Sequence, residues 1–111
     1  MYNFQIYNNI NNNYQINQFS NSLNLKVAEY ANFDNEMIDF GISIINKAYS
    51  IMNKYDDITK YVSNSFDSKY PEKTHWNCFI WPKGNDRCFY WSKKRIWCTT
   101  DIDTILIFLA G

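Results

Sequence analysis

The stretch "DITKYVSNSFDSKYPEKTHWNCFIW", residues 57–81, decides the fold, because its hydrophobic pattern changes once along its length. In the first half, apolar side chains recur at every fourth position: Ile58, Val62, Phe66 and Tyr70. The residues between them are mostly polar. This period predicts a helix with one apolar face, and such a helix must lie on a flat apolar surface.

The second half predicts that surface. Pro71 ends the helix, because the residue before a proline is disfavoured in the α region. "THWNCFIW", residues 74–81, is then rich in aromatic and branched side chains, as strands are. We therefore expect a helix that leads directly into a strand.

A strand and a second helix are expected before this stretch. "LKVAEYANF", residues 25–33, predicts a first strand with Leu25, Val27 and Tyr30 on one face. The following residues, "DNEMIDFGISIINKAYSIMNKY", predict a long helix that is buried over much of its circumference.

Acidic residues mark where both helices begin. Asp34 is the expected N-cap of the long helix, and Asp56 or Asp57 is the expected cap of the next one. The apolar stripe of the long helix consists of Met37, Gly41, Ile44, Ile45, Ala48 and Met52, widened by Ile38, Ile42 and Tyr49.

The C-terminal third predicts short strands with short connections. The expected strands are 87–92, 95–100 and 104–110. The expected turns lie at 82–85, at Lys93-Lys94 and at 101–103. Asp101 and Asp103 are therefore expected in a turn. Short links favour antiparallel neighbours, so we expect a strand meander. Two helices followed by strands predict an α+β fold in which both helices cover an antiparallel sheet.

Composition divides the chain into two regions. Residues 1–24 carry no charged side chain and are rich in asparagine, which predicts a flexible extension. Residues 25–111 form the expected domain. We find no secretory signal and no apolar run long enough for a membrane span, so we expect a cytoplasmic protein without membrane contact.

The chemistry-bearing residues do not form a catalytic or metal motif. His75, Cys78, Cys88 and Cys98 have the right types for zinc, but their spacing is not that of a zinc finger, so we expect reduced core cysteines, no cofactor and no metal. Three residues along a strand place His75 and Cys78 on opposite faces, which argues against a nucleophile–base pair. We expect no enzymatic activity.

A binder of single-stranded nucleic acid is an alternative. "WSKKRIW", residues 91–97, interleaves basic and aromatic side chains, as such binders do. The formal net charge of the chain is zero, which favours a hairpin turn with solvated lysines instead. We therefore expect no nucleic-acid partner.

Five sequence segments resemble the small dynein light chain family. They are Asp57-Ile58, Phe66-Asp67-Ser68-Lys69-Tyr70, Trp76-Asn77-Cys78, "NEMIDF" at 35–40 and "TILIFLAG" at 104–111. The similarity spans about residues 25–111. It implies a non-catalytic homodimer in which one strand of each chain crosses to the partner's sheet. Clients, among them dynein intermediate chains, would add to the dimer as extended strands.

The resemblance also implies which residues form the site. The peptide groove would contain Asp56, Asn85, Asp86, Arg87, Cys88, Phe89, Tyr90 and Trp97, and the dimer interface Asn77, Cys78 and Trp91. The family's Gly-Ser-Tyr in the crossing strand is replaced by Asn85-Asp86-Arg87, and its interface histidine by Asn77. Loss of that histidine predicts a dimer that does not dissociate in mild acid.

The function expected from the resemblance is that of an adaptor in a dynein motor complex, cytoplasmic and associated with microtubules. A dimerisation hub unrelated to the motor is the alternative within the same fold.

Overall fold

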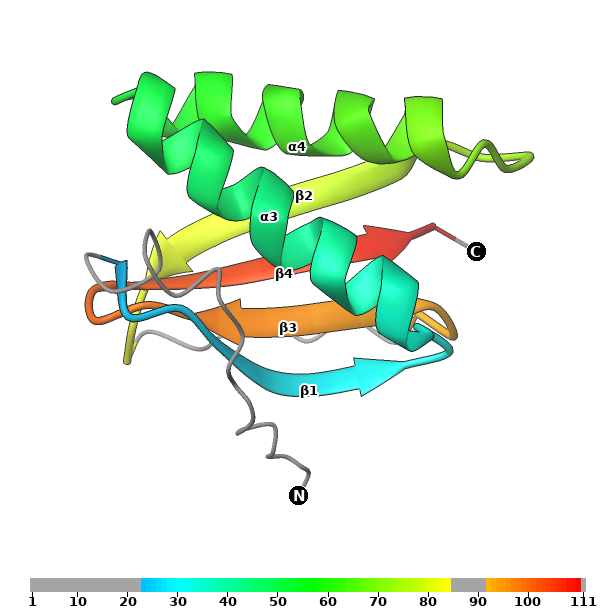
Figure 1. Cartoon of the computed structure of the whole chain (residues 1–111), viewed down its shortest axis with the longest axis horizontal. Helices are drawn as coiled ribbons and strands as arrows, with labels where there is room; N and C mark the ends of the chain where they lie inside the picture. The colour runs from blue at the N-terminus through cyan, green and yellow to red at the C-terminus, as the bar shows by residue number, and fades with distance from the viewer. Residues whose placement is uncertain (1–22, 85–91, 111) are drawn as a thin grey trace.

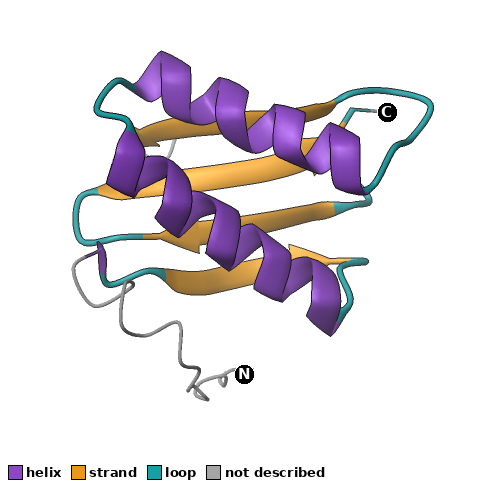
Figure 2. Ribbon diagram, turned by 45° about the horizontal axis from the view of Figure 1, so that its top comes forward, coloured by secondary structure: helices purple, strands orange, loops and turns teal. Residues whose placement is uncertain are grey.

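The computed structural model describes residues 23–84 and 92–110. In chain order, the described elements are β1 (Lys26–Ala31), α3 (Asn35–Ile51), α4 (Tyr55–Lys69), β2 (Trp76–Pro82), β3 (Arg95–Thr99) and β4 (Asp103–Leu109). The four strands form one sheet in the order β1-β3-β4-β2, and every neighbouring pair is antiparallel. Both helices lie on the same face of that sheet (Figures 1 and 2). The predicted α+β fold is confirmed.

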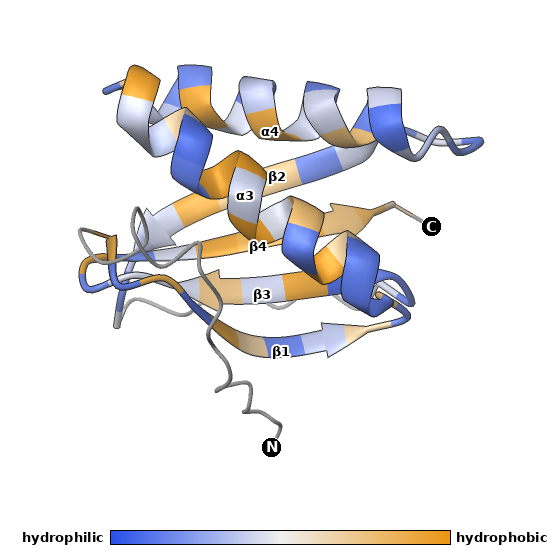
Figure 3. Ribbon diagram, in the orientation of Figure 1, coloured by the Kyte–Doolittle hydropathy of each residue, from blue (hydrophilic) through white to orange (hydrophobic). Residues whose placement is uncertain are grey.

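The predicted meander is wrong, because β4 lies between β2 and β3. Residues 103–108 of β4 are all buried, and a strand that is covered on both faces belongs in the middle of a sheet. Figure 3 shows β4 coloured mostly as hydrophobic. Since β2 and β3 are both antiparallel to β4, they run parallel to each other. The end of β2 at Pro82 and the start of β3 at Arg95 therefore lie at opposite ends of the sheet.

The long helix α3 follows the sequence prediction. The Asp34 side chain accepts a hydrogen bond of 2.9 Å from the backbone N–H of Met37, so the predicted N-cap is confirmed. Its buried residues are Met37, Ile38, Gly41, Ile42, Ile45, Asn46 and Ala48.

Helix α4 begins earlier than predicted. Its N-cap is Lys54, whose side chain makes no capping bond, and Asp56 and Asp57 lie inside the first turn. The predicted cap is therefore wrong, although both carboxylates still interact favourably with the positive end of the helix dipole. The four-residue period is confirmed, because Ile58, Val62 and Phe66 are buried. The helix ends at Lys69, before Pro71, as predicted.

Phe66 is the centre of the contact between helices and sheet. Its side chain is fully buried, and its ring centroid lies 5.0 Å from that of Trp76 on β2 and 5.1 Å from that of Phe40 on α3. The indole N–H of Trp76 donates a 2.8 Å bond to the carbonyl of Tyr70. The amphipathic helix and the aromatic strand thus contact each other directly across the residues that connect them.

A β-bulge in β1 changes which of its side chains share a face of the sheet. The register with β3 shifts between Val27 and Glu29, so Val27 pairs with Cys98 and Tyr30 pairs with Ile96. Cys98 and Ile96 are both fully buried, and the bulge therefore places Val27 and Tyr30 on the same face although they are three residues apart.

Candidate functional site

Strand β2 forms one border of the sheet. Among residues 23–84 and 92–110, it pairs with β4 alone. Its register with β4 is unbroken from Trp76, opposite Leu109, to Pro82, opposite Asp103. An edge strand of this regularity offers one row of backbone groups to another extended chain.

The hydrogen-bond pattern identifies those groups. The N–H of Lys83 donates a 2.8 Å bond to the carbonyl of Ile102, just beyond the register. Antiparallel residues alternate between bonded and non-bonded pairs. The backbone groups that bond to β4 are therefore those of Asn77, Phe79 and Trp81. The backbone groups that face outward are those of the alternate residues, Trp76, Cys78, Ile80 and Pro82.

The two ends of this row differ from its middle. The outward N–H of Trp76 donates a 2.8 Å bond to Oδ1 of Asp67, at the end of α4. The other carboxylate oxygen of Asp67 lies 3.3 Å from Nδ1 of His75. Pro82, at the far end, has no N–H. Within residues 23–84 and 92–110, the outward N–H and carbonyl groups of Cys78 and Ile80 have no partner.

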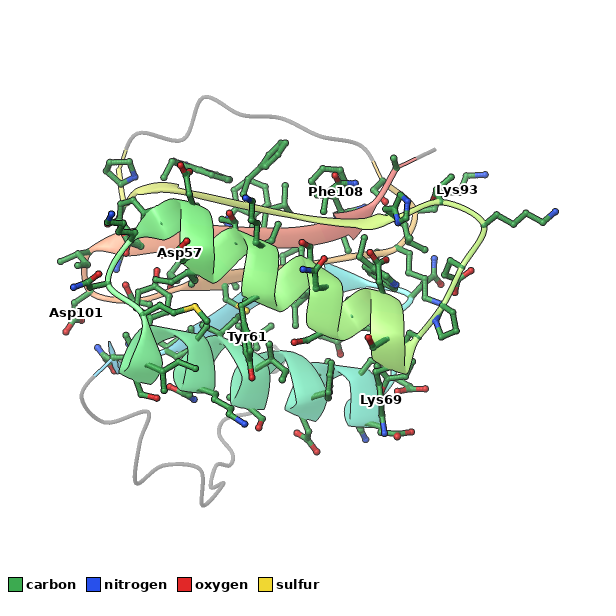
Figure 4. The ribbon with its side chains drawn as sticks, turned by 90° about the horizontal axis from the view of Figure 1, so that it is seen from above. Asp57, Tyr61, Lys69, Lys93, Asp101 and Phe108 are labelled. Atoms are coloured by element: carbon green, nitrogen blue, oxygen red, sulfur yellow. The ribbon has the colours of Figure 1, made fainter. Side chains whose placement is uncertain are left out.

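Helix α4 forms the wall beside this border. In Figure 4, β2 passes α4 on the side away from α3. One side of α4 carries Thr59, Ser63 and Asp67, which are spaced by four residues. The hydrogen bond from the Trp76 N–H to Asp67 shows that this side of α4 faces the outward backbone groups of β2. All three are half-buried. A strand added to β2 would therefore meet hydroxyl and carboxylate groups on its helical side.

The opposite border of the sheet is protected. β1 carries the bulge, and Glu29 accepts a 3.1 Å bond from Nε of Arg95 on β3. Bulges and charges are devices that prevent a strand edge from pairing with other chains. Of the two borders, β2 is the one suited to strand addition.

The two described residues that were predicted for the groove, Asp56 and Trp97, lie apart within one chain. Asp56 is exposed in the first turn of α4, in the helical layer. Trp97 lies between Ile96 and Cys98, whose side chains face the helices, so its own side chain faces the other side of the sheet. There its ring centroid is 5.7 Å from that of Trp81. One chain does not bring Asp56 and Trp97 together.

The two described residues predicted for the dimer interface have different environments. The Cys78 side chain is buried against the helices, and this burial raises the pKa of its thiol far above the ordinary value. Only the backbone of Cys78 faces outward. Asn77 points to the opposite face, is half-buried, and donates a 3.2 Å bond to the carbonyl of His75.

The rest of the predicted site lies outside the described residues. These positions are Asn85, Asp86, Arg87, Cys88, Phe89, Tyr90 and Trp91. In sequence they fall between β2 and β3.

The face of the sheet opposite the helices carries aromatic side chains. Phe79 is 45% exposed, and its ring lies 5.2 Å from that of Phe108 in an edge contact. Trp81 and Trp97 form the second such pair. Partly exposed aromatic residues in this density are typical of protein interfaces.

Asp103 is the residue that the sequence prediction misplaced. It is not in a turn but is the first residue of β4, and it is 1% exposed. Its carboxylate accepts hydrogen bonds from the hydroxyls of Tyr49 and Tyr55. The available signal was the period of two from Asp103 to Ile105 and Ile107, which places the acid on the core face.

Within the described residues, no group of three or more His, Cys, Asp or Glu side chains could hold a metal ion. Neither described helix is long and apolar enough to cross a membrane.

No protein-family model matches the sequence, and no curated protein matches it. The structure is similar to the dynein light chain-like domain of the calcium-binding protein FhCaBP2 from Fasciola hepatica, solved as a mercury derivative. The TM-score is 0.62 at 13% sequence identity, and the match covers 78% of this chain and 92% of the other. Two helices on a four-stranded antiparallel sheet in this arrangement give the chain a dynein light chain-like fold.

Proposed function

We propose that this protein is a non-catalytic homodimeric adaptor that holds extended client segments by strand addition. The observation that carries this proposal is the border formed by β2, whose regular register and outward backbone groups at Cys78 and Ile80 can take up a strand from a second copy, to which a client strand then adds. Main-chain hydrogen bonds along such a border give affinity for an extended chain of almost any sequence.

The topology supports exchange of a strand between two copies. Seven residues, 85–91, can extend over about 23 Å, and the seven residues of β2 have the same extended length. In the proposed dimer these residues pair with β2 of the partner, and Trp91, Asn77 and the backbone of Cys78 lie at the contact.

The aromatic face would be the second part of the contact. Phe79, Trp81 and Trp97 lie on the side of the sheet that the helices leave open, where a second sheet can pack against them. A dimer would also bring together Asp56 and Trp97 from different chains. The client groove would then be built from both copies, with Arg87, Phe89 and Tyr90 selecting side chains.

Dynein intermediate chains are the first clients to test. The fold supports an adaptor role, and the helix-two segment resembles that of dynein light chains. On this proposal the protein acts in the cytoplasm as part of a microtubule-based motor complex.

A dimerisation hub with other clients is the second candidate. The crossing segment has Asn85-Asp86-Arg87 where the family has Gly-Ser-Tyr, and no family model matches the chain. Affinity capture with tagged protein separates the two candidates. Recovery of dynein intermediate or heavy chains supports the motor adaptor, and their absence from specifically captured clients supports the independent hub.

The dimer is tested with a proline at an outward amide. Ile80→Pro removes an N–H that makes no bond to β4, so the fold should tolerate it as edge strands tolerate proline. Ile80→Ala shortens the same side chain and keeps the N–H, and it is the matched control. Sedimentation velocity should show dimers for wild type and Ile80→Ala, and folded monomers for Ile80→Pro. A wild-type monomer across the micromolar range, or an Ile80→Pro dimer as tight as the control, would contradict the proposal.

A further inference from the structure

Tyr55 joins an exposed ring to a buried acid. The residue is 47% exposed, whereas Asp103, whose carboxylate accepts the hydrogen bond of the Tyr55 hydroxyl, is 1% exposed. The same carboxylate accepts a bond from Tyr49, and the ion pairs among the described residues do not include it. A buried negative charge therefore depends on two phenol donors, and one of these donors borders solvent.

The chain around Tyr55 is accessible over several residues. Residues 53–57 are all exposed, and Met52 and Lys54 have extended backbone angles just before α4 begins. The Lys54 side chain makes no capping bond, so this first turn can fray more readily than a capped one. An enzyme that modifies the phenol needs such access, because it must position the hydroxyl for in-line attack.

We propose that Tyr55 is a phosphorylation site for a protein tyrosine kinase, and that its modification separates the first turn of α4 from β4. In the transfer, the phenol oxygen bonds to the γ-phosphorus of ATP, and the bond from that phosphorus to the bridging oxygen breaks, which releases ADP. The phenol proton passes to the carboxylate base of the kinase. This inference concerns a single chain and goes beyond the proposed adaptor function.

Phosphorylation turns the contact between Tyr55 and Asp103 from attractive to repulsive. The esterified oxygen has no proton to donate, so the 2.7 Å hydrogen bond is lost. A phosphate with a charge of about −1.5 to −2 would also face a buried carboxylate, and like charges repel strongly where water is excluded. Lys54 supplies one positive charge nearby, but Asp56 and Asp57 supply two negative ones. The modified ring therefore turns into solvent and releases the first turn.

Phosphorylation of the full chain by a broad-specificity tyrosine kinase with ATP tests the site, with mass spectrometry to locate the phosphate. Tyr55 should be modified at least about tenfold faster than the half-buried tyrosines, because these must first be exposed by local unfolding. The half-buried tyrosines are Tyr49, Tyr61 and Tyr70. Tyr55→Phe keeps the ring and should lose only this phosphate. Equal rates at Tyr55 and the half-buried tyrosines, or no phosphate at Tyr55, would overturn the proposal.

Amide hydrogen exchange, measured by NMR, tests the consequence for α4. The N–H groups of Asp57 and Ile58 donate to the carbonyl of Lys54 at 3.1 and 3.0 Å, so they report on the first turn. Phosphorylation should speed their exchange by at least about tenfold. The N–H of Tyr70, which donates to the carbonyl of Phe66 at the other end of α4, should not change.

Asp103→Asn is the matched variant, because it removes the charge and keeps the side-chain shape. Relative to each unmodified protein, phosphorylation should speed exchange at Asp57 and Ile58 less in this variant than in wild type. Unmodified Tyr55→Phe gives a second comparison that does not need Asp103→Asn to fold. It loses the hydrogen bond without gaining charge, so its first turn should exchange more slowly than that of phosphorylated wild type. No change on phosphorylation of wild type, or equal changes in either comparison, would show that Asp103 does not respond to the phosphate.

Discussion

The hydroxyl of Tyr55, the first residue of α4, donates a 2.7 Å hydrogen bond to the carboxylate of Asp103, the first residue of β4. Tyr49 of α3 donates to the other carboxylate oxygen at 2.9 Å. One buried acid thus joins both helices to the central strand. Because α4 is the wall beside the β2 border, this clamp fixes one end of the proposed binding site.

Replacement of the acid should destabilise the fold. In Asp103→Asn, the side-chain NH2 group would replace one of the two carboxylate oxygens, so one tyrosine hydroxyl would lose its acceptor. A buried donor without a partner lowers the free energy of unfolding by about 1–3 kcal/mol. Urea unfolding followed by circular dichroism measures this loss. Asp101→Asn, on the exposed preceding turn, is the control and should change the unfolding free energy by less than about 0.5 kcal/mol. Equal effects of the two substitutions would show that the clamp does not contribute.

Stability should fall at alkaline pH because of Tyr49. Burial, and then the hydrogen bond to Asp103, raise the pKa of Tyr49 above its ordinary value near 10. A phenol whose pKa is higher in the folded state stabilises the protein fully below the unfolded pKa, and this contribution is lost as pH rises above it. The unfolding free energy should therefore decline above about pH 10.

The matched variant is Tyr49→Phe, which keeps the ring and removes the ionisable group. Its unfolding free energy should be lower than that of wild type at neutral pH but should decline less steeply above about pH 10. Parallel pH profiles for the two proteins would exclude Tyr49 as the source of the alkaline loss.

Phe66 should be among the most costly core positions. Phe66→Ala removes a fully buried ring that contacts Phe33, Phe40 and Trp76, and such truncations cost about 3–5 kcal/mol. Ile51→Ala, at a side chain that is 58% exposed, is the control and should cost far less. Thermal and urea unfolding both measure the difference. A loss below about 1 kcal/mol for Phe66→Ala would mean that the helix and strand do not pack as described.

The proposed dimer should persist in mild acid. Asn77 does not titrate, and the chain contains one histidine, His75, whose side chain is 92% exposed. Asn77→His would place an ionisable group at the proposed contact and should make the dimer dissociate as pH falls through about 6.5. Sedimentation velocity across this range compares the two proteins. Acid dissociation of wild type, or acid resistance of Asn77→His, would contradict the placement of Asn77 at the interface.

The elements themselves were predictable from local patterns. The four-residue period of Ile58, Val62 and Phe66, the Asp34 cap and the stop at Pro71 appear in the structure as expected, because amphipathicity, capping and proline sterics act over a few residues. The two helices and their packing on an antiparallel sheet followed from the same patterns, whereas their position on the same face is a finding of the structure.

The sequence by itself thus determined the elements, their type and the apolar faces by which they pack. Only the tertiary structure decided that β4 separates β2 from β3, that Asp103 is buried under two tyrosines, and that Asp67 holds the first outward amide of β2. Each of these depends on residues that are distant in sequence or on different elements. Strand order and buried polar partners are set by which surfaces exclude water together, and no local period carries that information.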